Sequence, residues 1–183
     1  MKRFLLITCG VILFAPIAWG QAGGIGLYFD QDYHEDCYHD VEAALVQVYV
    51  VHMLTPGATA SQFMVIPGGG FNCTFTGEVI AVPVSIGSSL GGLSASYGGC
   101  MVYPILISTM SYFCMGTSPA CAYLQVVPDP AAPTGEIEVV DCSFVKRFAV
   151  GGTAYLNPSG ACELYCIHPT EQTSWGKVKV LYE

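Results

Sequence analysis

The residues best suited to bind a metal ion gather in one acidic segment near the start of the chain. Residues 30–42 contain six carboxylates and two histidines, with no lysine or arginine. Crowded carboxylates repel one another, and a hard cation such as calcium relieves that repulsion through oxygen ligands, whereas histidines favour zinc or copper. The candidate metal ligands are Asp30, Asp32, His34, Asp36 and His39.

The spacing within this segment departs from the calcium-loop pattern D-x-[DN]-x-[DN]-G, because positions 34 and 35 do not supply the required residues. A solvated loop that holds the negative charge of the domain at one end explains the same composition. The sequence therefore leaves two interpretations open, a divalent metal site or a plain acidic loop, and it predicts no other cofactor.

A second candidate site is the G-x-S-x-G pattern over residues 87–91, with Ser89 in the place of a hydrolase nucleophile. A strand-like run ends at Ile86, as this motif requires. The residues that follow, 92–99, are too rich in glycine and serine to form the helix that must come next. The only histidine further along the chain is His168. We predict a turn here, and no catalytic residue anywhere in the chain.

The cysteines indicate a disulfide framework. Nine are present, and Cys9 lies in an N-terminal segment that we expect to be removed. The remaining eight are Cys37, Cys73, Cys100, Cys114, Cys121, Cys142, Cys162 and Cys166. An even number in an exported chain favours disulfide pairing. Short spacing favours the local pairs Cys114–Cys121 and Cys162–Cys166, and it leaves the pairing of the other four open.

The first twenty residues have the pattern of a signal peptide. A basic start at Lys2 and Arg3 precedes an apolar run over residues 4–17, and Ala18 and Gly20 are small enough for cleavage before Gln21. A membrane anchor is the alternative, but the run is shorter than the roughly 20 residues that span a bilayer. We expect a mature chain without a transmembrane segment, exported to the periplasm, the cell surface or the medium.

The composition excludes several classes of function. Charged residues make up 11% of the chain, against about 25% in ordinary soluble domains. Removal of the signal peptide leaves 4 basic side chains against 14 acidic ones, a net charge of −10, which excludes a nucleic-acid-binding surface. Mean hydropathy of +0.51 excludes a disordered chain. The mature length suits one domain.

The pattern of apolar residues predicts β-structure throughout. Between residues 43 and 128 the only charged residue is Glu78, so surface helices with a charged face are excluded there. Apolar residues alternate instead, and turn signals separate the runs. The predicted strands are residues 25–29, 46–51, 61–66, 79–86, 93–97, 105–114, 121–127, 136–142 and 145–150. Pro83 predicts that its strand lies at an edge or carries a bulge.

These strands predict an all-β fold, an antiparallel two-sheet β-sandwich held by disulfides over residues 21–168, with a barrel as the alternative. The pair Gly151-Gly152 predicts a turn. Residues 169–183 form a separate C-terminal tail that carries Lys177 and Lys179. A short terminal helix is slightly favoured there over a strand.

The chain also resembles known proteins at both ends. The order I-G-L-Y-F-D over residues 25–30, then Cys37, then V-Y-V-V over residues 48–51 resembles a group of small exported bacterial proteins. The ending W-G-K-V-K-V-L-Y over residues 175–182 is similar to tails of some of these proteins. The resemblance implies a cohesin-like or immunoglobulin-like sandwich. It brings no catalytic or binding residue to carry over.

We therefore predict a non-catalytic exported module that acts by contact, as a surface, matrix, adhesion or assembly subunit. Its uncharged strands lack the lysines that usually discourage pairing at sheet edges. Its partner would be a protein or a glycan at the cell surface or outside the cell. The alternative function is a metal-binding protein or metal-dependent enzyme that uses residues 30–42.

Overall fold

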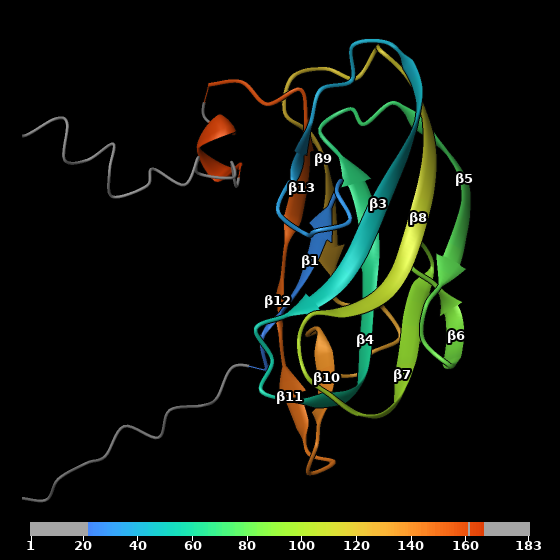
Figure 1. Cartoon of the computed structure of the whole chain (residues 1–183), viewed down its shortest axis with the longest axis vertical. Coiled ribbons are helices and arrows are strands. Elements are labelled where there is room, and N and C mark those ends of the chain that lie inside the picture. The colour runs from blue at the N-terminus through green and yellow to red at the C-terminus, as the bar shows by residue number, and fades with distance from the viewer. Residues whose placement is uncertain (1–21, 161, 167–183) are drawn as a thin grey trace, which may run out of the picture.

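Two β-sheets face each other in the computed structural model, which describes residues 22–160 and 162–166 (Figure 1). The five-stranded sheet has the order β12 (Val150–Gly151), β1 (Gly24–Tyr28), β3 (Ala43–Met53), β8 (Ile105–Met115) and β5 (Cys73–Ile80). The other sheet has eight strands. Six of them run in the order β11 (Lys146–Phe148), β10 (Glu138–Asp141), β4 (Ala58–Gly68), β9 (Ala122–Val127), β13 (Thr153–Leu156) and β2 (Cys37–Tyr38).

The other two strands of the eight-stranded sheet extend it beyond β4. Strand β7 (Gly92–Met101) pairs with the first half of β4, and β6 (Val84–Ser88) pairs with β7. The second half of β4 pairs with β9, while its first half also pairs with β10. A single 3₁₀ turn, η1 (Glu163–Tyr165), follows the last strand.

The core lies between the two sheets because alternate residues of each long strand point inward. Val46, Val48 and Val50 of β3 are buried against Phe63 and Val65 of β4 in one apolar cluster. Residues with the opposite parity face outward, as the pleat of a strand requires. The predicted all-β sandwich is therefore confirmed, and strands are found where alternation predicted them in β1, β3, β4, β7, β8 and β9.

The sheets are mixed rather than purely antiparallel, which corrects the prediction. Strand β12 runs parallel to β1, and β13 runs parallel to β2. The predicted turn at Gly151-Gly152 is also wrong, since the chain continues there from β12 in one sheet to β13 in the other. At this crossing a Cβ on Gly151 would lie 2.1 Å from the carbonyl oxygen of Val126, so the crossing requires a glycine.

The predicted strand over residues 79–86 is two strands. Strand β5 ends at Ile80, and β6 begins at Val84 after Pro83. Proline cannot donate a ladder hydrogen bond, so the pairing stops and the chain passes from the five-stranded sheet to the eight-stranded one. Both β5 and β6 are edge strands, as Pro83 predicted.

Other boundaries differ from the predictions in smaller ways. The run over residues 145–150 is divided between β11 and β12, and alternation did not predict β2, β13 or residues 73–78 of β5. The expected signal peptide, the tail over residues 169–183 and the domain boundary at residue 168 lie outside the described residues.

Candidate functional site

The acidic segment forms a loop over the outer face of the five-stranded sheet, between β1 and β2. Oδ1 of Asp30 accepts hydrogen bonds from the backbone N–H groups of His34 at 2.8 Å and Glu35 at 2.7 Å. Tyr33 of this loop packs against Tyr28 and Tyr49 on the sheet. The carboxylate of Asp30 therefore stabilises the turn of the loop itself.

The five predicted metal ligands lie at different depths in this region. Asp32, His34 and His39 are exposed, Asp30 is half-buried, and Asp36 is buried with only 8% of its surface accessible. In the part of the chain that the structure describes, no three of the five bring their ligand atoms within 4.8 Å of one another. The metal site stays a prediction from sequence, to be tested by metal analysis.

Asp40, a residue of the same acidic segment, is buried at one end of the sandwich. Its carboxylate accepts hydrogen bonds from the backbone N–H groups of Gly116 at 2.7 Å and Ser118 at 3.0 Å. Its own N–H donates to Oδ1 of Asn157 at 2.8 Å, and Nδ2 of Asn157 donates to the carbonyl of Ser118 at 2.7 Å. Burial raises the pKa of the Asp40 carboxyl, but hydrogen bonds from Ser118, Gly116 and Thr117 outweigh it and hold the pKa below its ordinary value.

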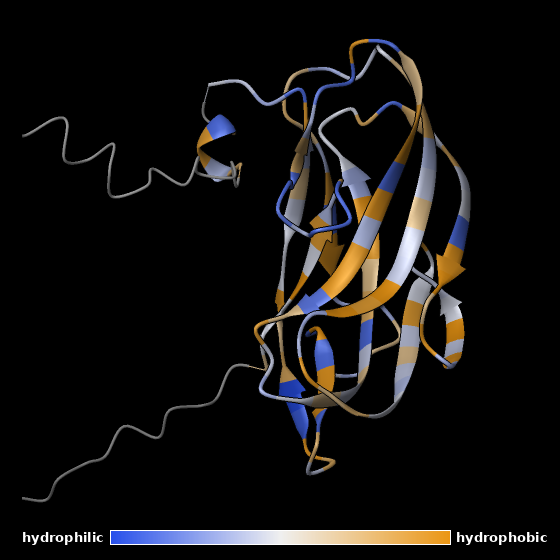
Figure 2. Cartoon of the chain, viewed as in Figure 1, coloured by the Kyte–Doolittle hydropathy of each residue, from blue (hydrophilic) through white to orange (hydrophobic). Residues whose placement is uncertain are grey.

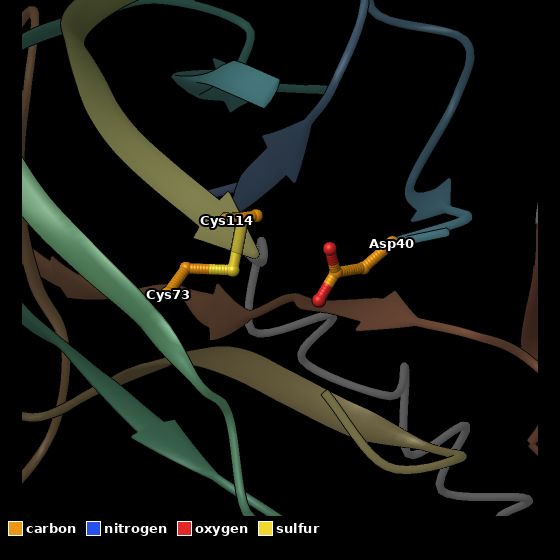
Figure 3. Close-up of side chains that lie close together, drawn as sticks. All are labelled: Asp40, Cys73 and Cys114. Atoms are coloured by element: carbon orange, nitrogen blue, oxygen red, sulfur yellow. A yellow bond between two sulfur atoms is a disulfide. The ribbon is translucent and has the colours of Figure 1, made fainter. Parts of the chain in front are cut away.

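The carboxylate of Asp40 also lies beside the disulfide between Cys73 and Cys114, with its oxygen and both sulfurs within 4.8 Å of one another (Figure 3). The sulfurs are bonded to each other, so they offer no thiolate for a metal. This group therefore joins the β2–β3 connection to the end of β8 as part of the framework of the fold.

The predicted nucleophile Ser89 is fully buried in the turn between β6 and β7. Its hydroxyl donates to Oε1 of Glu78 and lies 3.1 Å from the hydroxyl of Ser108. Its backbone N–H donates to Oε2 of Glu78 at 3.1 Å. This serine therefore ties the β6–β7 turn to β5, in agreement with the predicted turn, and its hydroxyl is not presented to a substrate.

All eight cysteines of the expected mature chain form disulfides, which confirms the predicted framework. The bonds are Cys37–Cys166, Cys73–Cys114, Cys100–Cys142 and Cys121–Cys162. Both predicted local pairs, Cys114–Cys121 and Cys162–Cys166, are wrong. Sequence separations of 41 to 129 residues show that the bonds join distant strands and loops, which neighbouring spacing in the sequence does not reveal.

The outer face of the eight-stranded sheet carries an open groove of about 300 Å³ across β6, β7, β4 and β10. We call it the β6–β10 groove. Small side chains make its floor, namely Ala60 of β4 with Ser94 and Ser96 of β7. Register pairing places Ala60 opposite Ser96, and Gln62 opposite Ser94, on this same face. Because these side chains are short, the floor lies below the longer side chains on either side of it.

The two walls of the groove differ in character. Val84 and Ile86 of β6 make an apolar wall and are 59% and 76% exposed. Across the groove, Val140 stands beside an ion pair in which Nζ of Lys146 lies 2.6 Å from Oε2 of Glu138. The hydrogen bond from Lys146, assisted by one from Thr134, holds the pKa of the Glu138 carboxyl below its ordinary value against the opposing effect of burial.

A row of tyrosines lies on the same outer face, on the strands beyond β4. Tyr123 of β9 and Tyr155 of β13 are directly paired across the two strands, with ring centroids 6.3 Å apart. Tyr165 of η1 stacks on Tyr155 at the same centroid distance, and it is 68% exposed. Neither this row nor the groove was predicted from the sequence, because each depends on strand order and register.

No family model and no curated protein matches this sequence. Solved cohesin structures match its fold at low identity. The cohesin module of a family 33 glycoside hydrolase from Clostridium perfringens is 8% identical, with a TM-score of 0.45, over 76% of this chain and 99% of the module. A type I cohesin–dockerin complex from Clostridium thermocellum gives 8% identity and a TM-score of 0.47, over 73% of this chain and 99% of the matched chain.

The sixth cohesin of scaffoldin B from Acetivibrio cellulolyticus is 11% identical, with a TM-score of 0.40, over 74% of this chain and 99% of that cohesin. The β-sandwich itself is shown by the two facing sheets described above. The C-terminal motif and the bacterial origin stay predictions. Among the described residues, no helix has the length and apolar character needed to cross a membrane.

Proposed function

We propose that this chain is a non-catalytic module that acts by binding a protein partner in the β6–β10 groove. The observation that carries the proposal is the shape of the groove, a floor of Ala60, Ser94 and Ser96 beside a wall of exposed Val84 and Ile86. Exposed apolar side chains that rim a concave surface are typical of binding sites. The four disulfides fit the export that the N-terminal sequence predicts.

The dimensions of the groove suit an α-helix of the partner. Strands β6 and β10 stand three strand spacings apart, which is about 14 Å between backbones. An α-helix with its side chains is roughly 10–12 Å across. It would therefore rest on the small residues of the floor and contact Val84 and Ile86 with one face. Full burial of an isoleucine side chain contributes about 1.5–3 kcal/mol, so these two residues would supply much of the affinity.

The ion pair on the opposite wall would orient the partner. Lys146 is 59% exposed at its side chain and Glu138 only 5%, so a partner would meet the ammonium group first. A carboxylate on the bound helix would share Lys146 with Glu138. Such a contact at the rim gives more to the association rate and to specificity than to affinity.

A variant whose side chain fills the groove tests the proposal. Ser94→Arg places a long side chain on the floor, and Gln47→Arg on the outer face of the five-stranded sheet is the matched control. Both proteins, with the unchanged chain, are immobilised and exposed to secreted and envelope proteins of cells that make this protein. We expect a discrete bound species that Ser94→Arg loses and Gln47→Arg keeps. If Ser94→Arg kept the bound species and Gln47→Arg lost it, the contact would lie on the five-stranded sheet and the proposal would be refuted.

The row of Tyr123, Tyr155 and Tyr165 favours a glycan as a second candidate partner. Aromatic rings exposed on a sheet face offer apolar surface to the face of a sugar ring, and Tyr165 presents most of its own. Electrophoresis through gels that contain soluble polysaccharides would test it. Retardation that Tyr165→Ala abolishes, and that Tyr103→Ala on a distant loop leaves unchanged, would support this candidate. Equal mobility in every gel would eliminate it.

The metal-dependent alternative has its own test. Protein purified without chelator is analysed for bound metal, beside the variants Asp32→Ala and His34→Ala. A stoichiometric divalent ion that both variants lose would support a metal-binding function for residues 30–42. If the unchanged chain held no more metal than the two variants, this alternative would be eliminated.

A further inference from the structure

Strand β5 is an open edge of the five-stranded sheet. In the described part of the chain it pairs with β8 alone, and it lies along the outside of the molecule (Figure 1). It is eight residues long, against five for β6, one of the open edges of the other sheet. The disulfide between Cys73 and Cys114 joins β5 to β8 at directly paired positions. This edge is therefore already ordered, and pairing it with another strand costs little conformational entropy.

Two of the usual protections of an edge strand, lysine and proline, are missing from β5. Lysines, prolines and inward-pointing charges normally prevent such edges from pairing. Strand β5 has no lysine, and Pro83 comes only after its end. Its one charged residue, Glu78, points inward and directs both carboxylate oxygens to the hydroxyl and N–H of Ser89 in the β6–β7 turn. Two protective features are present, namely the inward-pointing Glu78 and the register shift between Phe75 and Gly77, which leaves a regular segment on each side.

Charge makes this edge the easiest place for two copies to meet. The described residues hold two basic and twelve acidic side chains, a formal charge of −10, so two copies repel each other over most of their surface. Between residues 43 and 128 the only charged side chain is that of Glu78, and Ser89 donates a hydrogen bond to its carboxylate. Figure 2 shows continuous hydrophilic stretches in the β1–β2 loop and on β10 and β11, and isolated hydrophilic bands on β3 and β5.

We propose that two copies of this chain associate through β5, strand to strand and antiparallel about a two-fold axis. The two five-stranded sheets then become one ten-stranded sheet, with β5 of each copy at the centre. Backbone N–H and C=O groups on the outer side of β5 pair with those of the second copy, as in strand addition to an open edge. Val79, which is 69% exposed on the outer face of this sheet, then lies beside side chains of the partner strand.

The apolar character of the neighbouring outer face continues across such a junction. Thr74 of β5, Phe113 of β8 and Leu45 of β3 stand in one cross-strand row, and the last two are 40% and 64% exposed. A second copy carries the same row on the other side of the two-fold axis. An isologous contact of this kind needs one self-complementary surface, and an uncharged strand provides it.

The test is the mass of the oxidised mature chain in solution, measured by sedimentation equilibrium from micromolar to millimolar concentration. We expect a reversible monomer–dimer equilibrium. Val79→Lys places a positive charge on each side of the two-fold axis and should weaken dimerisation by about tenfold or more, because like charges on facing strands repel. Gln47→Lys, on the same outer face but in the interior of the sheet, makes the same change in net charge and should not weaken dimerisation. A monomer at every concentration would overturn the proposal.

A second measurement guards against misfolding and against association at another surface. Val79 is largely exposed, so at a concentration where both proteins are monomeric Val79→Lys should unfold at the same urea concentration as the unchanged chain. Amide hydrogen exchange in β5 should slow as protein concentration rises, while exchange in β6 should not. A dimer that Ile86→Lys dissociates and Val79→Lys leaves intact would place the contact in the β6–β10 groove and refute pairing through β5. This outcome is distinct from failure of the groove proposal, which concerns a different protein partner.

Discussion

His52 lies fully buried near the end of β3 with both ring nitrogens engaged. Nε2 lies 2.7 Å from the carbonyl oxygen of Ala22, which only accepts, so Nε2 carries the proton. In the neutral ring, Nδ1 then accepts from the hydroxyl of Tyr97 at 3.1 Å. Burial lowers the pKa of His52, although the hydrogen bond to Ala22 acts in the opposite direction. The structure thus holds this histidine in its neutral form.

This buried histidine predicts a loss of stability in mild acid. The folded-state pKa lies below the unfolded value of about 6.5, so the unfolded chain takes up the proton first as the pH falls. Stability should be constant above about pH 6.5 and then decrease, by at most about 1.4 kcal/mol per pH unit for one proton, until the folded-state pKa is passed. Urea unfolding of the unchanged chain and of His52→Gln at pH 7.5 and pH 5.5 measures the difference. An equal loss in both proteins would contradict the prediction.

Asp40 makes a second prediction at the level of single residues. Asp40→Ala leaves the N–H groups of Gly116 and Ser118 buried without their acceptor, which should cost about 2–4 kcal/mol of unfolding free energy. Asp32→Ala, in the same acidic segment but exposed, should change it by no more than about 0.5 kcal/mol. Chemical denaturation at pH 7 compares the two. A cost for Asp40→Ala as small as that for Asp32→Ala would show that the buried carboxylate contributes little.

Among the elements, the crossing from β12 to β13 restricts the residue type most strongly. Gly151→Ala puts a methyl group 2.1 Å from the carbonyl oxygen of Val126, which belongs to the backbone and has little room to move. We expect a loss of roughly 2–4 kcal/mol in unfolding free energy. Gly99→Ala is the matched control, because a Cβ there meets nothing within 4 Å. Equal midpoints of thermal unfolding for the two variants would mean that the backbone at the crossing shifts to accommodate the methyl group.

The strands also show how far alternation predicts this fold. Strand β3 was predictable because Val46, Val48 and Val50 repeat at the period of a half-buried strand. The division at Pro83 was predictable only in part, since the missing N–H ends a ladder but does not say which sheet the chain joins next. Short strands such as β2 (Cys37–Tyr38) have too few residues to show any period.

The candidate surfaces could not be predicted from the sequence for a related reason. Ala60 and Ser96 line one groove floor although they are far apart along the chain, because the register of β4 on β7 makes them partners. Disulfide pairing has the same dependence, since Cys37 meets Cys166 only after the sheets are assembled. The uncharged edge, in contrast, was predicted from composition, because the single charge between residues 43 and 128 is visible in the sequence.

At the scale of the whole molecule, the separation of charge from strand edge determines how copies approach one another. The acidic side chains give each copy a repulsive field, while the pairing proposed at β5 uses backbone hydrogen bonds and apolar contact, which salt leaves largely unaffected. Dimerisation through β5 should therefore strengthen with ionic strength, which is the opposite of the behaviour of an interface built on ion pairs.

Salt titration tests this balance between repulsion and edge pairing. From about 0.02 M to about 0.3 M salt the Debye length falls from roughly 20 Å to roughly 6 Å, so the repulsion between two copies of charge −10 is largely screened. Sedimentation equilibrium should show the dimer dissociation constant decreasing severalfold over this range, and Gln47→Lys should show the same trend. A dissociation constant that rises with salt would mean that opposite charges hold the copies together. The contact would then lie where Lys146 and Arg147 meet carboxylates, and not at the uncharged edge.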